Sequence, residues 1–178
     1  LVTRLPVALL RNFVIRDQLP TGIRCAEAPA INLNAAPYSA AGFVPGGVIT
    51  PTCTNTLVEW NFGDQRVTQG TTNNYYDFAI RFIARVDNSA TNNSGTLIRN
   101  GGTATSVTAT YVDQAGGTVT LSFGESAIQV REPVIALTKT FAVASADAAD
   151  ILTVTVTATN TGTGTAYNLQ VLDDLTGK

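Results

Sequence analysis

The segment Tyr75-Tyr76-Asp77-Phe78-Ala79-Ile80-Arg81-Phe82-Ile83-Ala84-Arg85-Val86-Asp87 decides the fold class of this chain of 178 residues. Apolar or aromatic side chains occupy every second position, and most of the positions between them are charged. This period of two is that of a β-strand with one buried face. The segment therefore predicts one long strand, whose inner face carries Tyr76, Phe78, Ile80, Phe82, Ala84 and Val86.

The same period recurs along most of the chain, and no segment has a clear helical period. Turn signals rich in Gly, Asn and Pro separate these segments at roughly ten-residue spacing. A long Ala/Pro/Gly/Asn-rich excursion over residues 23–56 reads as loop. We expect an all-β fold, an antiparallel sandwich of short strands. The further strand-like segments are residues 10–16, 57–63, 106–112, 118–123, 128–141, 151–159 and 166–172.

The composition limits the classes of function. Hydrophobic residues make up 44% of the chain and charged residues 13%, which is enough apolar material for a core. The net charge of −2 comes without a basic cluster, so nucleic acid is not an expected partner. No apolar stretch approaches the roughly 20 residues of a membrane helix, so no membrane insertion is expected. Histidine is absent, which removes the commonest general base, and we expect no enzyme.

Two cysteines, Cys25 and Cys53, predict one disulfide and an oxidising compartment. The bridge would join residues with a separation of 53 − 25 = 28. In the chain-entropy treatment it stabilises the fold by about 3–4 kcal/mol. The alternative is two unpaired buried thiols, and neither cysteine has the spacing of a metal site.

The end of the chain repeats its beginning. Residues 12–22 and 168–177 both run as an alternating apolar strand into Asp, then Leu, then Thr-Gly. Asp17 matches Asp173, an offset of 173 − 17 = 156 residues. Such self-similarity is typical of arrays of stacked modules. We expect residues 1–132 to form a module that lacks its opening strands. Residues 133–178 would be the opening strands of the following module, or donor strands for a neighbouring subunit.

These motifs resemble one family, the conserved repeat of bacterial surface proteins known as domain of unknown function eleven. The likeness covers essentially the whole chain in circularly permuted order, and it departs at Thr176, where the family has Pro, and in the long 23–56 insertion. It implies immunoglobulin-like β-sandwich modules in tandem on large secreted or surface-attached proteins, and no chemistry. The segments that carry it are 132–139, 153–162 with its Asn-Thr-Gly, 171–175, 60–63, 78–86 and 98–100.

Lys139 is a candidate for unusual chemistry, because alternation from Ile135 to Phe141 puts it on the apolar face of its strand. A core-facing lysine is costly unless it is paired or neutral. One hypothesis is an isopeptide bond to Asn100 of a neighbouring module, with Asp17 as the assisting acid and Asp173 as the acid of Lys139's own module. The alternative is a snorkelling lysine or an ordinary ion pair.

Two weaker site hypotheses concern sugars and calcium. Trp60, with Tyr75 and Tyr76, would form a glycan-stacking platform if exposed, although its β pattern is equally that of a core tryptophan. Calcium would need oxygen ligands from turns such as residues 87–93 and 147–150. No spacing there matches a defined calcium loop, so we expect no metal or other cofactor.

The sequence thus predicts a structural repeat module of an extracellular bacterial surface fibre, sheath or array. It would act as spacer and assembly unit, with copies of itself or adjacent modules as head-to-tail partners. Separate copies would join by β-strand complementation, and the alternative is one long chain in which the modules are continuous. The alternative is an adhesin or carbohydrate-binding module, which requires an exposed aromatic platform and a glycan partner.

Overall fold

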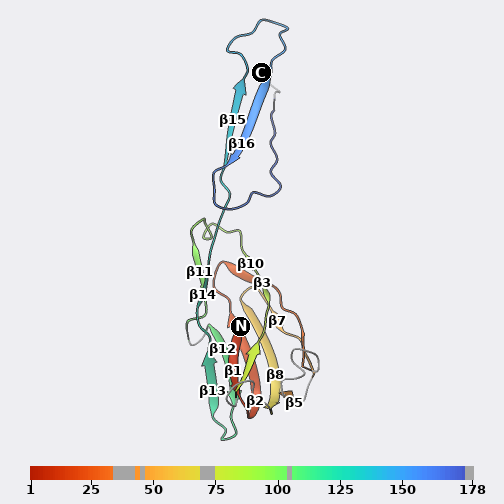
Figure 1. Cartoon of the computed structure of the whole chain (residues 1–178), viewed down its shortest axis with the longest axis vertical. Helices are drawn as coiled ribbons and strands as arrows, with labels where there is room; N and C mark the ends of the chain where they lie inside the picture. The colour runs from red at the N-terminus through yellow and green to blue at the C-terminus, as the bar shows by residue number, and fades with distance from the viewer. Residues whose placement is uncertain (34–42, 45–46, 69–74, 104–105, 175–178) are drawn as a thin grey trace. The chain divides into compact units, whose positions relative to one another are not determined.

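The computed structural model describes residues 1–33, 43–44, 47–68, 75–103 and 106–174. These residues form strands and no helix, which confirms the all-β class (Figure 1). In this part of the chain no helix is long and apolar enough to cross a bilayer. The strands are, in chain order, β1 (Val2–Pro6), β2 (Leu9–Gln18), β3 (Ile23–Glu27), β4 (Ile31–Asn32), β5 (Phe43–Val44), β6 (Val48–Ile49), β7 (Thr52–Cys53), β8 (Leu57–Val67), β9 (Tyr75–Ala79), β10 (Ile83–Val86), β11 (Leu97–Asn100), β12 (Val107–Val112), β13 (Thr118–Ser122), β14 (Ser126–Gln129), β15 (Ile135–Phe141) and β16 (Val154–Asn160).

The chain divides into two compact units. The first contains Leu1–Asn92 and Leu97–Ile128, and the second contains Asn93–Thr96 and Gln129–Lys178. The main division, between residues 128 and 129, falls just before the boundary that the sequence places after residue 132. The sequence did not indicate that a short piece of the first half, residues 93–96, belongs with the second unit.

The first unit is built on a sheet that has six strands among the described residues. Its order is β13-β12-β2-β8-β5, with β7 also paired to β8, and all its pairs are antiparallel. Strand β2 lies between β12 and β8, so Asp17 has Val107 as its partner on one side and Val58 on the other. Strand β2 is therefore an interior strand of the sheet, with a paired strand along each of its edges.

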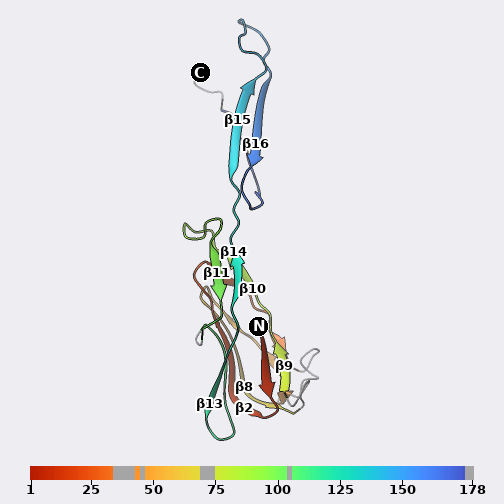
Figure 2. The ribbon, with the colours of Figure 1, turned by 60° about the vertical axis from the view of Figure 1, so that its left-hand side comes forward.

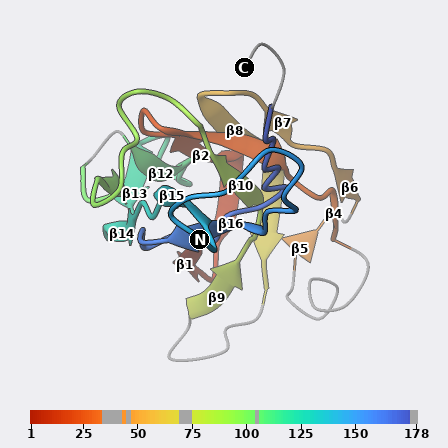
Figure 3. The same ribbon diagram turned by 90° about the horizontal axis from the view of Figure 1, so that it is seen from above.

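A second layer of paired strands covers the inner face of this sheet. The covering pairs are β1 with β9 and β3 with β10, and β11 pairs separately with β14 (Figure 2). The Phe78 ring of β9 packs edge-on against Phe13 of β2 and Phe62 of β8, with centroids 6.2 and 5.4 Å apart. Figure 3 shows β9 on the side of the core opposite β8. The core thus lies between the large sheet and these pairs, as two packed layers require.

The segment 75–87 differs from its prediction in an informative way. It forms two strands, β9 and β10, and the break over residues 80–82 contradicts the single strand expected from its period. Strand β9 pairs with β1, whereas β10 pairs with β3. Phe78 and Ile80 are buried, but Ala84 and Val86 are exposed. The apolar face therefore continues beyond the part of the core that is covered.

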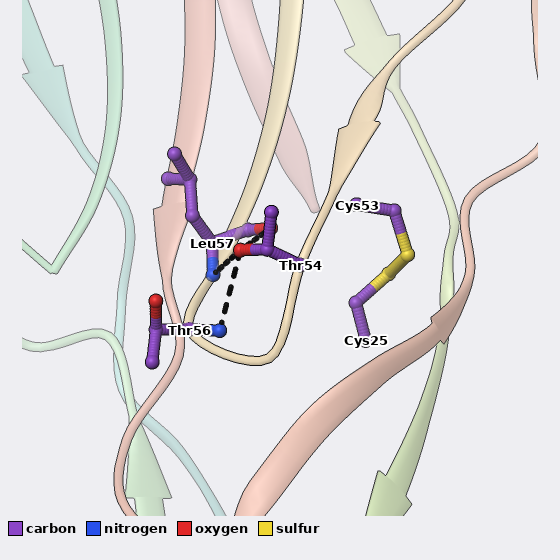
Figure 4. The surroundings of a disulfide bond; sticks show 5 residues. All are labelled: Cys25, Cys53, Thr54, Thr56 and Leu57. Atoms are coloured by element: carbon purple, nitrogen blue, oxygen red, sulfur yellow. Dashed lines mark hydrogen bonds between the residues drawn. A yellow bond between two sulfur atoms is a disulfide. The ribbon is translucent and has the colours of Figure 1, made fainter.

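The predicted disulfide is present and joins the two layers. Cys25 of β3 is bonded to Cys53 of β7, with their Cα atoms 5.7 Å apart. Because β7 pairs with β8, the bridge ties the β3–β10 pair to the large sheet. Next to it Thr54 closes a turn, where its Oγ1 accepts a hydrogen bond of 3.0 Å from the Leu57 amide (Figure 4).

The second unit contains the antiparallel pair of β15 and β16, in a register from Ile135↔Asn160 to Phe141↔Val154. Side chains directly opposite one another share a face. One face is therefore threonine-rich, and the other carries Leu137, Lys139 and Phe141 with their partners Ala158, Val156 and Val154. This apolar face is uncovered, since Leu137 is 59% exposed and Phe141 57%. Residues 161–174, all described, form no strand.

Candidate functional site

A buried carboxyl group lies near the end of strand β2 in the first unit. Asp17 is 0% exposed, and its Oδ2 accepts a hydrogen bond of 3.0 Å from Asn100 Nδ2. Burial raises the pKa of Asp17 above its ordinary value, and the hydrogen bond from Asn100 partly offsets this. The structure thus brings together two of the four residues of the isopeptide hypothesis, from strands β2 and β11.

Asn100 is held in place by the local structure at the end of β11. The next residue, Gly101, has φ +90°, and a Cβ there would lie 2.3 Å from the backbone oxygen of Gly124. Only glycine fits this conformation and this close approach. On the other side of Asn100, Arg99 forms an ion pair with Glu125. The backbone on both sides of Asn100 is thereby fixed against the segment that leads into β14.

The pair of side chains is incomplete as a hydrogen-bonding group. Asp17 Oδ1 and Asn100 Oδ1 are buried, and no donor within the described residues reaches either atom. Buried acceptors without a partner are uncommon and each costs about 1–3 kcal/mol. Asp17 and Asn100 each keep one such oxygen.

A pocket of about 190 Å³ lies beside Asn100. Its walls come from the β3–β10 pair and the segment before β10 on one side and from β11 and β14 on the other. Asn100 belongs both to the pocket wall and to the hydrogen bond with Asp17. The pocket is therefore an apolar slot with one polar wall. Its lining residues are Ile23, Phe82, Ala84, Val86, Ile98, Asn100, Ser126 and Ile128.

The other two residues of the isopeptide hypothesis lie together in the second unit. Lys139 Nζ is 2.8 Å from Asp173 Oδ1, and the two side chains are 38% and 36% exposed. The ammonium group also lies 6.0 Å from the centroid of the Phe141 ring. This is the ordinary ion pair that the sequence left as the alternative. A bond between Lys139 and Asn100 stays a prediction.

The predicted sugar platform is wrong for Trp60. This side chain is 0% exposed and packs near Phe82, with ring centroids 6.0 Å apart. It has no free face for a sugar ring. Tyr76 is half-buried against the core, and the side chain of Tyr75 lies outside the described residues.

The turn residues considered for calcium have structural roles. The buried Asn92 donates from Nδ2 to the carbonyl oxygens of Gly22 (2.7 Å) and Asp87 (2.8 Å). Asp150 accepts a hydrogen bond of 2.8 Å from the Asp147 amide. Within the described ranges, no three acidic, Cys or His side chains gather as a metal site. The buried role of Asn92 was not predicted from the sequence, and an Asn inside a polar turn was the available signal.

Comparison with known proteins adds no relative. No family model, no curated protein and no solved structure matches this chain. The features of the molecule that bear on function are the buried pair, the pocket beside Asn100 and the apolar face of the second unit.

Proposed function

We propose that this chain is a structural module of an extracellular bacterial surface fibre, sheath or array. It acts as spacer and assembly unit, and its copies join head to tail by β-strand complementation in an immunoglobulin-like sandwich. One observation carries the proposal. The first unit has an open apolar slot, and the second unit has an uncovered apolar strand pair.

The second unit supplies the donor in this proposal. A pair of strands alone is marginally stable in water and needs a partner for its apolar face. Leu137 and Phe141 on β15 lie opposite Ala158 and Val154 on β16, so this face is continuous across both strands. Such an uncovered face marks an interaction surface.

The first unit supplies the acceptor. Its slot is bordered by β10 and by the β11–β14 pair, which belong to separate sheets. An extended segment can add to strand edges through main-chain hydrogen bonds, while its alternate side chains fill the slot. Because donor and acceptor are different surfaces, repeated joining is heterologous and produces an open filament. The disulfide fits an oxidising, extracellular setting.

Sedimentation velocity over a range of concentrations tests this proposal on the full chain. We expect association that increases with concentration and that Leu137→Glu on the apolar face weakens roughly tenfold to hundredfold, as expected when the burial of one Leu is lost. Ala136→Glu puts the same charge on the opposite face and should leave association unchanged. A wild-type chain that stays monomeric at high concentration would contradict the proposal.

A further inference from the structure

The two units share a short sequence match whose aspartates have different partners. Asp17 and Asp173 are separated by 156 residues, and each follows an alternating apolar run. In the second unit, Asp173 binds the ammonium group of Lys139 at 2.8 Å. In the first unit, the matching Asp17 accepts a hydrogen bond from Asn100, and one oxygen of each side chain has no donor among the residues that the structure describes. The internal match therefore indicates a lysine for the position beside Asp17.

We propose that the Asp17–Asn100 pair is a binding site for a lysine side chain, and that its occupant is Lys139 on β15 of a second copy of this chain. The inference rests on the head-to-tail assembly proposed above. It adds the contact that sets the register of the joint and the residues on each side of it.

The chemistry of the pair matches an ammonium group. A lysine has three N–H donors and no acceptor, so one Nζ carries enough donors for both Asp17 Oδ1 and Asn100 Oδ1. The carboxyl group of Asp17 supplies the opposite charge. The four-carbon stem of a lysine packs on apolar surface, which the lining of the pocket next to Asn100 provides.

The strand around Lys139 also matches the slot. Leu137 and Phe141 are two positions on either side of Lys139 and share its face. Each therefore lies about 6.5–7 Å from it along the strand. Lys139 would meet the polar pair, while the apolar side chains on either side of it would contact the apolar walls of the slot. The slot offers such walls on both sides, including Val86 of β10 and Ile128 of β14.

Transfer of Lys139 from Asp173 to Asp17 costs little in the donor copy. Both members of its present ion pair are more than one-third exposed, and ion pairs of that kind contribute little to stability. The segment 161–174 that carries Asp173 has no strand pairing to break. At Asp17 the ammonium group loses water, but it satisfies two buried oxygens and meets a buried acid. This exchange of equivalent partners is that of a domain swap.

Complementary variants of the full chain test the site. Lys139→Glu removes the donor and leaves the acceptor pair, whereas Asp17→Asn weakens the acceptor and leaves the donor. We expect each variant alone to associate at least tenfold more weakly than the wild type. An equimolar mixture of the two should form dimers and stop there, because one intact joint is available per pair of chains. Thr138→Glu, on the threonine face, is the matched control and should associate like the wild type.

The outcomes separate this site from the wider function. If the wild type and Lys139→Glu associate equally, or the mixture stays monomeric, the lysine site is overturned while strand complementation stands. If the wild type itself does not associate, the assembly function falls with it. Intact mass spectrometry under denaturing conditions shows whether the joined chains are linked covalently. Joined chains that have lost one ammonia per junction, with Lys139 mapped to Asn100, would support the site through a covalent amide in which Nζ replaces the Asn100 amide nitrogen.

Discussion

Asn100 and Asp17 are 83 residues apart in the sequence and meet through one hydrogen bond of 3.0 Å between Nδ2 and Oδ2. Asp17 lies on the large sheet and Asn100 on the separate β11–β14 pair. A polar contact in apolar surroundings is specific about geometry, because a small slip leaves both groups unpaired. This bond therefore fixes how β11 sits on the large sheet and keeps the polar wall of the pocket in place.

Removal of the Asn100 amide should destabilise the first unit. Asn100→Leu keeps the approximate volume but leaves the Asp17 carboxyl with no donor, so we expect the free energy of unfolding to fall by about 1–3 kcal/mol. Urea denaturation measures this loss. Asn88→Ala, at an exposed turn position, is the control and should change stability by less than about 0.5 kcal/mol. Equal effects of the two substitutions would argue against the importance of the bond.

The raised pKa of Asp17 predicts a pH dependence with a definite sign. Below about pH 4, the ordinary pKa of Asp, both folded and unfolded chains hold the proton. At higher pH the unfolded chain releases it first, so the contribution of Asp17 to the free energy of unfolding falls with pH and levels off above the folded pKa. Asp17→Asn removes this contribution. Chemical denaturation across the acid range should show the variant gaining stability relative to the wild type as pH rises, and parallel profiles would contradict the prediction.

Loss of the disulfide should weaken both stability and the pocket wall. Replacing Cys25 and Cys53 together by Ser avoids a free thiol and should lower the free energy of unfolding by about 3–4 kcal/mol. Because the bridge ties β3 and β10 to the large sheet, amide hydrogen exchange should rise in residues 83–86. Wild-type protein treated with reductant is the comparison and should show the same pattern. Unchanged amide exchange in β10 would mean that its pairing with β3, without the disulfide, is enough to hold this wall of the pocket.

Gly101 and Gly116 allow conformational strain to be separated from steric overlap. Both have positive φ, +90° and +86°, but a Cβ at Gly116 meets nothing within 4 Å, whereas at Gly101 it would overlap the Gly124 backbone. We expect Gly116→Ala to cost roughly 1–2 kcal/mol from the left-handed conformation alone. Gly101→Ala should cost clearly more and should shift the NMR signals of the Asn100 side-chain amide. Similar costs for both would show that the overlap is relieved without moving Asn100.

Much of the strand content could be predicted from local pattern, because a buried face imposes a period of two. The Asn-Thr-Gly signature that follows the strand 151–159 forms a hydrogen-bonded turn in the structure. Asn160 Oδ1 accepts hydrogen bonds from the amides of Val134 (3.1 Å) and Gly162 (3.0 Å). The break over residues 80–82 could not be predicted, since period two persists through it and only the choice of partner strands ends β9. In β2, positive φ at Asn12 and a shift of register likewise let Leu10 and Phe13 both face the core.

The residues of the candidate site could be predicted from the sequence, but their hydrogen bonds and the pocket beside them could not. An Asp after an apolar run and a Lys within one are visible as charges at core-facing positions, which burial makes unusual. Whether the buried oxygens of Asp17 and Asn100 have hydrogen-bond donors depends on which strands pack around the pair. The alternation of apolar residues does not specify that packing. The pocket depends on the same choice, because its walls come from four strands distant in the chain.

The bridge between Cys25 and Cys53 has a mechanical consequence. Under tension, a protein lengthens by releasing folded chain, but a covalent crosslink withholds the loop that it closes. Here the crosslinked residues are separated by 28 positions. At full extension that loop amounts to about 90–100 Å of contour length. A stretched oxidised unit should therefore stop short of a reduced one by this amount, so the redox state of its surroundings would set how far the protein can yield before load passes to its neighbours.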